Sequence, residues 1–407
     1  MLPQKSIPIR FIGLDLHKYY LIATAVDHEL NRVYGPRRVE LTELQDWIKK
    51  TLTLEDAIVL EMTGNTWQVY DELQPFSHSV TVVHPPHVSL IVRAQVMTDK
   101  IASFQLARLL AKGLLTGIWV PPQDVRDLRT LVAQRAKMTA IKTQAKNRLH
   151  ATLHRYHILP PDGKLFDPDN HTWWLSLSIS QLELVRVQSD LDTLSFAQQQ
   201  ITKIESCLAV WATHDERIAS LFQLCGVGLV TAVTVLAAVG DISRFPDANH
   251  LVGYSGLGAK VHVSGLTSRS GGITKAGRKD LRAALVEAAQ VAVLHDRHWK
   301  SELARLEPHI GRNKAVVAIA RKILVIIWHI LSQHQAEKGL DLERLARKYY
   351  EFAYTVGKVN WDGCPTAAAF IRQKMDEAGV GRDFTSFIYS RKRVVLPPSK
   401  LPTALTK

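Results

Sequence analysis

Three acidic residues lie where an apolar segment ends or a helix begins, and carboxylates in such positions can bind metal. Asp15 follows the apolar run of GLDLHK, Glu61 ends that of VLEMTG, and Asp99 opens a helical pattern in TDKIASFQLARLL. Clustered carboxylates repel one another unless a cation compensates them. Mg²⁺, or Mn²⁺ in its place, prefers oxygen ligands, and two such ions can stabilise both oxygens of a phosphoryl transfer. We therefore expect these three acids to hold a divalent metal.

Each acid taken singly has a simpler explanation. Asp99, beside Thr98 at a helix start, would be stabilised by the helix dipole without any metal. The joint placement at two strand ends and one helix start is what favours a metal site. One helical turn after Asp99, on the same helix face, stands Ala102 where a further acid would complete such a site.

The order of elements that must position these acids indicates an α/β fold. Apolar runs and turn residues predict three strands, followed by helices that alternate with two more strands. This order is that of the ribonuclease H-like fold, in which neighbouring strands about 4.8 Å apart would let Asp15 and Glu61 face one another. The expected strands span 8–16, 20–27, 32–39, 57–62 and 79–84, and Thr98 caps a helix that continues to about Lys112. The boundary of this domain, 1–122, is set at Pro121–Pro122.

A long helical pattern over 126–155 follows, and a second over 181–212 could return antiparallel to it. We predict a coiled-coil or helical linker over 123–215. Between the helices, Trp173 and Trp174 are expected to pack rather than to stack on bases. The apolar stripe of the first helix contains Leu131, Met138, Ala145, Leu149 and Leu153.

Basic residues occupy the rest of this first helix. Asp127 is the only acid between 126 and 155, whereas an ordinary solvated helix mixes both signs. We therefore favour contact with a nucleic-acid backbone over a plain solvated face. The chain as a whole carries a net charge of +13 with a pI near 9.6, which agrees with a polyanionic partner. The expected contact residues of this helix are Arg135, Lys142, Lys146 and Arg148.

The region 216–332 is predicted to be mainly helical. Gly226-Val227-Gly228 between apolar helices is similar to a helix-hairpin-helix turn, which presents amides to phosphates; a tight turn between helices is the alternative. A loop rich in glycine and serine follows, and it closes with Lys275, Arg278 and Lys279, which could bind a phosphate backbone. Residues 333–407 form a C-terminal extension to which the sequence assigns no role.

Composition excludes several classes of protein. Among 407 residues there are only three cysteines and no CxxC pair, which argues against a disulfide framework and a thiolate zinc site. We expect no membrane helix, since no wholly apolar run reaches roughly 18 residues, and no signal peptide. These features fit a protein of the cytoplasm.

The chain resembles transposases of the IS110/IS1111 insertion-sequence family. The resemblance spans roughly residues 8–332 and depends on the ordered combination of several segments. The matching segments are GLDLHK, LEMTGNTW, TDKIASFQLARLL, GVGLVTA, the stretch from Gly240 to Ala289 and KAVVAIARKILVIIWHIL.

The resemblance implies a RuvC-like domain with a D-E-D-D quartet, a coiled-coil linker and a C-terminal transposase domain with an essential serine. Asp15, Glu61 and Asp99 match the first three acids, whereas the fourth position holds Ala102. Ser264 matches the serine that forms a covalent link to DNA phosphate. The family also implies donor and target DNA, an element-encoded bridge RNA as guide, assembly as dimers and tetramers, and action at the nucleoid in the bacterial cytoplasm.

Two further functions remain open at this point. A RuvC-like junction nuclease would use the acids with an activated water and no covalent intermediate. A catalytically inactive nucleic-acid-binding protein would explain Ala102, whether that residue is natural or engineered. We expect this chain to bind nucleic acid well and to cut it weakly. Ser255, Ser268 and Ser270 compete with Ser264, since Ser255 and Ser270 also precede glycine; only the motif match selects Ser264.

Overall fold

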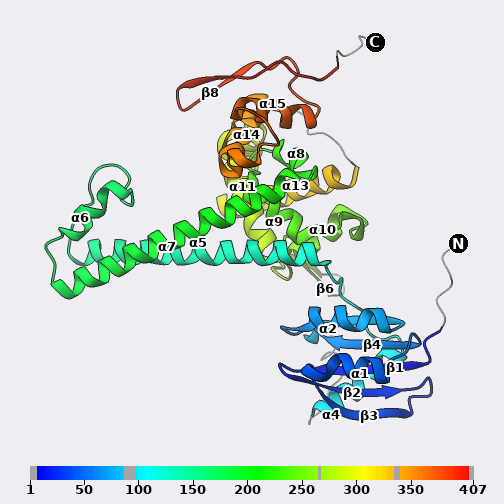
Figure 1. Cartoon of the computed structure of the whole chain (residues 1–407). Helices are drawn as coiled ribbons and strands as arrows, with labels where there is room; N and C mark the ends of the chain where they lie inside the picture. The colour runs from blue at the N-terminus through cyan, green and yellow to red at the C-terminus, as the bar shows by residue number, and fades with distance from the viewer. Residues whose placement is uncertain (1–6, 87–97, 265–266, 334–339, 403–407) are drawn as a thin grey trace. The chain divides into compact units, whose positions relative to one another are not determined.

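The structure, a computed structural model, describes residues 7–86, 98–264, 267–333 and 340–402. The chain forms two compact units, Met1–Pro122 (unit 1) and Gln123–Lys407 (unit 2) (Figure 1).

Unit 1 contains a five-stranded mixed sheet in the order β3-β2-β1-β4-β5. The central strand β1 (Arg10–Leu16) runs antiparallel to β2 (Tyr20–Val26) and parallel to β4 (Asp56–Glu61). The edges are β3 (Arg32–Glu40) and β5 (Ser79–Val83). This mixed sheet with helices on its faces is the ribonuclease H-like arrangement that the element order predicted.

One face of the sheet packs against α1 (Leu44–Thr51) and α2 (Thr66–Leu73). Ile12, Leu14 and Leu16 lie in this core, since alternate residues of a strand point to the same face. The odd-numbered residues of β1, Asp15 among them, therefore belong to the opposite face.

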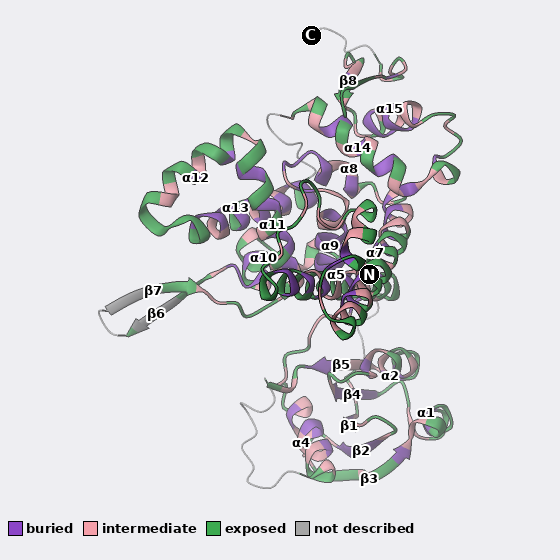
Figure 2. Ribbon diagram, turned by 90° about the vertical axis from the view of Figure 1, so that its left-hand side faces the viewer, coloured by how far each residue is buried: buried purple, intermediate pink, exposed green. Residues whose placement is uncertain are grey.

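The opposite face is covered by α4 (Asp99–Ala111), which lies across the sheet from α1 and α2 (Figure 2). The hydroxyl of Thr98 accepts a hydrogen bond from the amide of Ile101 at 3.4 Å, which is the N-cap that the sequence predicted. The side chains of Leu106 and Leu109 are buried on this face with Val59 and Val83 of the strands.

A close backbone contact sets the position of α4 on the sheet. A Cβ atom built on Gly13 of β1 would lie 2.0 Å from the carbonyl oxygen of Ser103 and 2.6 Å from the amide nitrogen of Ala107. Beside this contact the buried hydroxyls of Ser103 and Thr24 share a hydrogen bond of 2.8 Å. Only glycine lets the helix approach the strand this closely, so Gly13 sets the distance between α4 and β1.

In unit 2, α5 (Gln123–Arg155) and α7 (Gln181–Thr213) lie side by side in antiparallel orientation (Figure 1). Both helices agree with the predicted ranges. The predicted stripe is correct except at Leu131, which is 37% exposed. Leu128 and Val132 are buried instead, because the first turns of α5 also pack against α9 (Leu229–Val239).

The segment between α5 and α7 has a small core of its own. It contains η3 (Pro168–Asn170) and α6 (His171–Leu175). Trp174 is buried among Leu149 and Leu191, and its indole nitrogen donates to the carbonyl oxygen of Leu165 at 3.2 Å. The packing role expected for this tryptophan is confirmed.

The main core of unit 2 is helical, as predicted, and α9 passes through it. The structure places buried residues of the C-terminal extension in the same core, among them Tyr349 and Phe370. The other elements around this core are α8 (Arg217–Phe222), η4 (Ile242–Arg244), α10 (Ala248–Ser255), α11 (Lys279–His295), α12 (Arg297–Ile310), α13 (Arg312–Gln333), α14 (Leu342–Val356), η5 (Lys358–Asn360), α15 (Ala367–Glu377), β8 (Ser386–Tyr389) and β9 (Lys392–Val395).

One described helix, α13, is long and apolar enough to cross a membrane by length and composition alone. No such segment was expected from the sequence, because charged and polar residues interrupt the apolar run of this helix. Half of the most apolar window of α13 is buried, and the helix packs against α10, α11 and α12, as core helices do.

The glycine- and serine-rich segment predicted as a loop is a β-hairpin. Its strands are β6 (Ala259–Ser264) and β7 (Thr267–Ile273), and Ser264 pairs with Thr267. The prediction was wrong because glycine and serine do not show the alternation of apolar and polar side chains by which a strand is predicted. Backbone hydrogen bonds between two strands do not depend on side-chain size.

Gly13→Ala should destabilise unit 1, because its methyl group would collide with backbone atoms of α4 that cannot rotate away. We expect a loss of about 1–3 kcal/mol or more in the free energy of unfolding, measured by denaturant titration of the full chain. Gly64→Ala is the matched control, since a Cβ there meets no atom within 4 Å. Equal stability of the two variants would contradict the close contact.

Candidate functional site

Asp15 and Glu61 lie at neighbouring strand ends. β1 and β4 run parallel, and Leu14 is paired with Leu60. Asp15 and Glu61 are the next residues on the two strands, so the register places them side by side. The structure thus brings together the two strand acids that the sequence analysis selected.

Asp99, the first residue of α4, reaches the same place beside His17. The Nε2 atom of His17 lies 3.5 Å from Oδ2 of Asp15 and 3.2 Å from Oδ2 of Asp99. One ligand atom from each of these three residues lies within 4.8 Å of the other two. Glu61 is outside this tight group but remains close enough for its ionisation to respond to Asp15.

Two aromatic rings hold Asp99 in place. The hydroxyl of Tyr20 donates to Oδ2 of Asp99 at 3.1 Å, which raises the pKa of Tyr20. The ring of Tyr20 stacks on the imidazole of His17 with a centroid distance of 4.6 Å, and the guanidinium of Arg38 lies 3.7 Å from the centre of the Tyr20 ring. These contacts orient the carboxylate before any ligand binds.

The two strand acids, Asp15 and Glu61, are costly to ionise. Burial raises the pKa of Asp15, and the charge of Asp99 raises it further, while His17 acts in the opposite direction. Burial and then the charge of Asp15 raise the pKa of Glu61. A bound cation would reverse both effects, because it favours the ionised carboxylates.

His17 is the site residue that the sequence analysis missed. It lies within GLDLHK, where the sequence pattern predicts only Asp15 as a ligand. The available signal was its position two residues after Asp15, which returns a side chain to the same side of an extended chain.

Ala102 lies on the side of α4 that faces the sheet. It follows Asp99 by one helical turn and precedes the buried Ser103, and it is itself half-buried. An acid at this position would share a helix face with Asp99. The alanine leaves that position without a metal ligand.

The donor set fits a divalent cation. Asp15, Glu61 and Asp99 supply carboxylate oxygens, which suit Mg²⁺ and Mn²⁺, and His17 adds an imidazole nitrogen, which Mg²⁺ accepts less readily than transition metals do. The mutual approach of Asp15, His17 and Asp99 gives these atoms the spacing of ligands around one ion.

Of the four serines considered, the structure separates two. Ser264 is exposed at the end of β6. Ser255 is completely buried, where its hydroxyl donates to the carbonyl of Val252 at 2.7 Å and accepts from the amide of Leu257 at 3.2 Å. Ser255 is thus a structural residue, while the side chains of Ser268 and Ser270 lie outside the described part of the chain.

The three basic residues after the hairpin differ in their contacts. Lys275 and Lys279 are exposed. Arg278 forms an ion pair with Asp280 at 2.5 Å, so part of its charge is already compensated. The two lysines are therefore the better candidates for contact with a phosphate backbone.

Some of the basic residues of α5 form ion pairs with acids of α7. Arg135 pairs with Glu205 at 2.7 Å, and Arg148 pairs with Asp190 at 2.6 Å. The excess of positive charge within 126–155 is real, but acids from another helix compensate part of it. That compensation was invisible in the helix sequence alone.

The GVG turn is tight and internally braced. Gly226 has φ +82°, and a Cβ there would lie 2.1 Å from the carbonyl oxygen of Ala288. The ammonium group of Lys348 donates to the carbonyls of Phe222, Leu224 and Val227, and burial lowers its pKa to about 7. These contacts support the structural role; a phosphate-binding role for the turn stays a prediction.

Two transposase family models match this chain. A transposase model named for DEDD and IS110 matches residues 12–158, and that of the transposase IS116/IS110/IS902 family matches residues 219–304. Together they cover more than half of the chain. The first match contains the acid cluster and the second contains Ser264.

Relatives with similar sequences extend over most of the chain. The protein y4qE of Sinorhizobium fredii, named as a transposase, is 27% identical over 357 residues, which are 86% of this chain and 88% of the relative. The pilin gene-inverting protein of Moraxella bovis is 28% identical over 80% of this chain and 96% of its own length. The transposase for insertion sequence element IS1111A of Coxiella burnetii is 24% identical over 80% of this chain and 91% of its own.

Asp15→Asn should raise the Tm of the metal-free chain at pH 7.5 by about 1–3 °C. The folded-state pKa of Asp15 is above its ordinary value of 3.8, so its ionised form lowers stability at neutral pH. That cost shrinks as the pH falls through the raised folded-state pKa and is gone below 3.8, where the carboxyl becomes protonated in the unfolded state as well, and the difference in Tm should disappear with it.

Mn²⁺ should stabilise the wild-type chain and have little effect on Asp15→Asn. Scanning fluorimetry in EDTA and in millimolar Mn²⁺ measures both effects, with Asp46→Asn on the exposed face of α1 as control. An Asp15→Asn variant that is less stable than wild type in EDTA, or that gains equally from Mn²⁺, would refute the electrostatic account.

Proposed function

Because this chain belongs to the IS110 family of transposases, we propose that it cuts and rejoins DNA through the hydroxyl of Ser264, assisted by a divalent cation. The family implies DNA as substrate and a divalent metal as cofactor. The observation that carries the metal assignment is the convergence of Asp15, His17 and Asp99, with Glu61 on the adjoining strand.

Ser264 has the exposure that a nucleophile toward DNA requires. In the proposed step its Oγ forms a bond to phosphorus, and the bond from phosphorus to a deoxyribose oxygen breaks. The serine gives up its proton, and the leaving oxygen gains one. Rejoining reverses these changes with the hydroxyl of another DNA end, so each phosphodiester bond is conserved and no nucleotide cofactor is consumed.

The residues of the acid cluster have separate tasks in this proposal. Asp15, Glu61, Asp99 and the imidazole nitrogen of His17 would hold the cation, and the hydroxyl of Tyr20 keeps Asp99 oriented toward it. The bound ion supplies positive charge that makes a phosphate more electrophilic. Lys275 and Lys279 steady the DNA backbone beside Ser264. By family resemblance, donor and target DNA are selected by a bridge RNA, and the chain assembles as a dimer or tetramer.

Ala102 weakens this site in our proposal. The D-E-D-D pattern expects four acids, and three remain. His17 offers a fourth ligand atom, but it brings no negative charge to balance the cation. We infer that the chain binds metal less tightly than a four-acid site would and cuts DNA weakly, while DNA binding, which uses other surfaces, is retained.

Ser264→Ala should abolish covalent protein–DNA adducts while leaving DNA affinity within about twofold. Adducts are measured on denaturing gels after quenching with detergent, in the Ala102→Asp background if the wild-type yield is low. Ser255→Ala is the control: we expect lower stability but unchanged adduct yield per folded molecule. Cutting without adducts in the wild type would point instead to a nuclease that uses water.

Ala102→Asp should raise the rate of Mg²⁺-dependent strand exchange by tenfold or more, since it restores a carboxylate on the face that Asp99 shares. Its control is Ala111→Asp at the far end of the same helix. A rate for Ala102→Asp no higher than that of the control would refute the role given to this position.

A further inference from the structure

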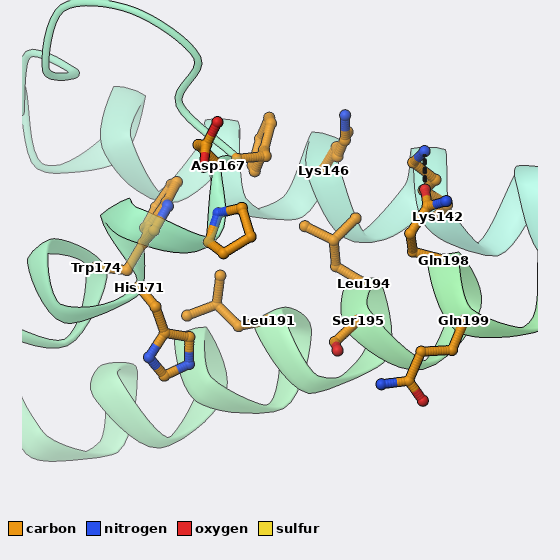
Figure 3. Close-up of a pocket in the computed structure, with 12 residues that line it drawn as sticks. Lys142, Lys146, Asp167, His171, Trp174, Leu191, Leu194, Ser195, Gln198 and Gln199 are labelled. Atoms are coloured by element: carbon orange, nitrogen blue, oxygen red, sulfur yellow. Dashed lines mark hydrogen bonds between the residues drawn. The ribbon is translucent and has the colours of Figure 1, made fainter. Parts of the chain in front are cut away.

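A cavity of 490 Å³ lies between α5, α7 and the segment that joins them. Its size falls in the range of small-ligand sites, roughly 300–1,000 Å³. Figure 3 shows Lys142 and Lys146 on α5, Leu191, Leu194, Ser195 and Gln198 on α7, and Trp174 on the joining segment. We call this cavity the helix-pair pocket.

Part of the wall of the helix-pair pocket is apolar and aromatic, and it is formed by Phe166, Pro168, Trp174, Leu191 and Leu194. Leu191 and Trp174 are buried in the small core described above, so these walls are held in place without a ligand. Phe166 lies parallel to Trp174 with a centroid distance of 6.0 Å. Surfaces of this kind bind the flat face of an aromatic ligand.

The two lysines that α5 contributes to this pocket form no ion pair with any described residue of α7. On either side along α5, Arg135 pairs with Glu205, and Arg148 pairs with Asp190. At the pocket α7 presents Ser195, Gln198 and Gln199. Asp192 also lies between the two pairs in sequence, but it is exposed, accepts from the side-chain amide of Gln188 and does not line the pocket. Within the described ranges, no carboxylate lies at ion-pair distance from Lys142 or Lys146.

The contacts of the two lysines are weak ones. Lys142 donates to the side-chain oxygen of Gln198, and the ammonium group of Lys146 lies 4.7 Å from the centre of the Phe166 ring. Burial, together with the charge of Lys146, lowers the pKa of Lys142. An anion between the two ammonium groups would relieve this repulsion. Asp167 is the one acid that lines the pocket, and its side chain is already bonded to the amide of Asp169.

We propose that the helix-pair pocket binds one unpaired nucleotide of a nucleic-acid strand. The base lies against Phe166 and Leu194, and the amide of Gln198 or Gln199 meets its polar edge. The phosphate lies near Lys142 and Lys146. This inference rests on the proposed function, because a transposase is the setting in which an unpaired DNA or RNA strand would reach the pocket.

Ser195→Trp tests the proposal, because an indole at this exposed rim position fills the pocket without removing a core residue. The probes are labelled 12-nucleotide strands of deoxythymidine and of uridine, and affinity for the full chain is measured by fluorescence anisotropy. We expect affinity to fall about tenfold, as on loss of one stacked base. The matched control is Ser189→Trp, exposed on the same helix outside the pocket, which should change affinity less than twofold.

Lys146→Gln tests the phosphate contact separately. The slope of log Kd against log salt should fall by about 0.7, the value for one phosphate contact to a single strand. Lys137→Gln, an exposed lysine of α5 outside the pocket, is the control and should leave the slope unchanged. A 4-thiouridine or 4-thiothymidine in the probe should crosslink to peptides from 166–174 or 191–199. The strand type that binds more tightly identifies the source of the nucleotide.

Three outcomes would overturn the inference. The first is equal strand affinity of Ser195→Trp and Ser189→Trp, and the second is crosslinks confined to other segments. The third is a change in the oligomeric state of Ser195→Trp with unchanged strand affinity, because this result would assign the pocket to a second copy of the chain. A wild-type chain that binds neither strand nor duplex DNA would refute the proposed function as well. Normal binding by wild type and Ser195→Trp alike would refute only the pocket.

Discussion

The contact between the backbone of α4 and β1 at Gly13 is the constraint on which the acid cluster depends. A carboxylate at a helix start can point almost anywhere; Asp99 lies beside Asp15 because the helix approaches the strand at a glycine. The hydroxyl pair of Ser103 and Thr24 fixes the same approach by a second, directional contact. A short stretch of sheet and one helix thus position residues that are more than eighty apart in the chain.

This arrangement makes the site unfavourable in itself. Burial and neighbouring charge raise the pKa of Asp15 and of Glu61. Their ionised forms are therefore less favourable in the folded chain than in water. The rest of the sheet, with its continuous apolar core against α1 and α2, supplies the stability that permits this arrangement. Carboxylates with shifted pKa values that lower the stability of the fold are typical of functional sites, among them metal sites without their ion. Ala102 reduces this cost, since one fewer charge is crowded into the same space.

In unit 2, charge is arranged by pairs of helices rather than by single ones. Acids of α7 compensate arginines of α5 at both sides of the helix-pair pocket, and neutral amides replace them at the pocket itself. Apolar packing between two helices does not require α7 to place acids opposite the arginines and neutral amides opposite the lysines. The local excess of charge, together with preformed aromatic walls, is what distinguishes the pocket from the gaps that occur along any pair of packed helices.

The order of strands and helices in unit 1, the two long helices of unit 2, the strand acids and the position of Ala102 could all be predicted from the amino-acid sequence. These follow from local patterns: apolar periodicity, the Thr98 cap, and the runs that end at Asp15 and Glu61. Other features became visible only in the folded chain. His17 joins the acid cluster, and Ser255 is buried while Ser264 is exposed. Acids of α7 pair with Arg135 and Arg148, and the serine-rich segment is a hairpin. Each of these depends on residues distant in sequence being brought together by packing, and no local pattern records which side chain another element will meet.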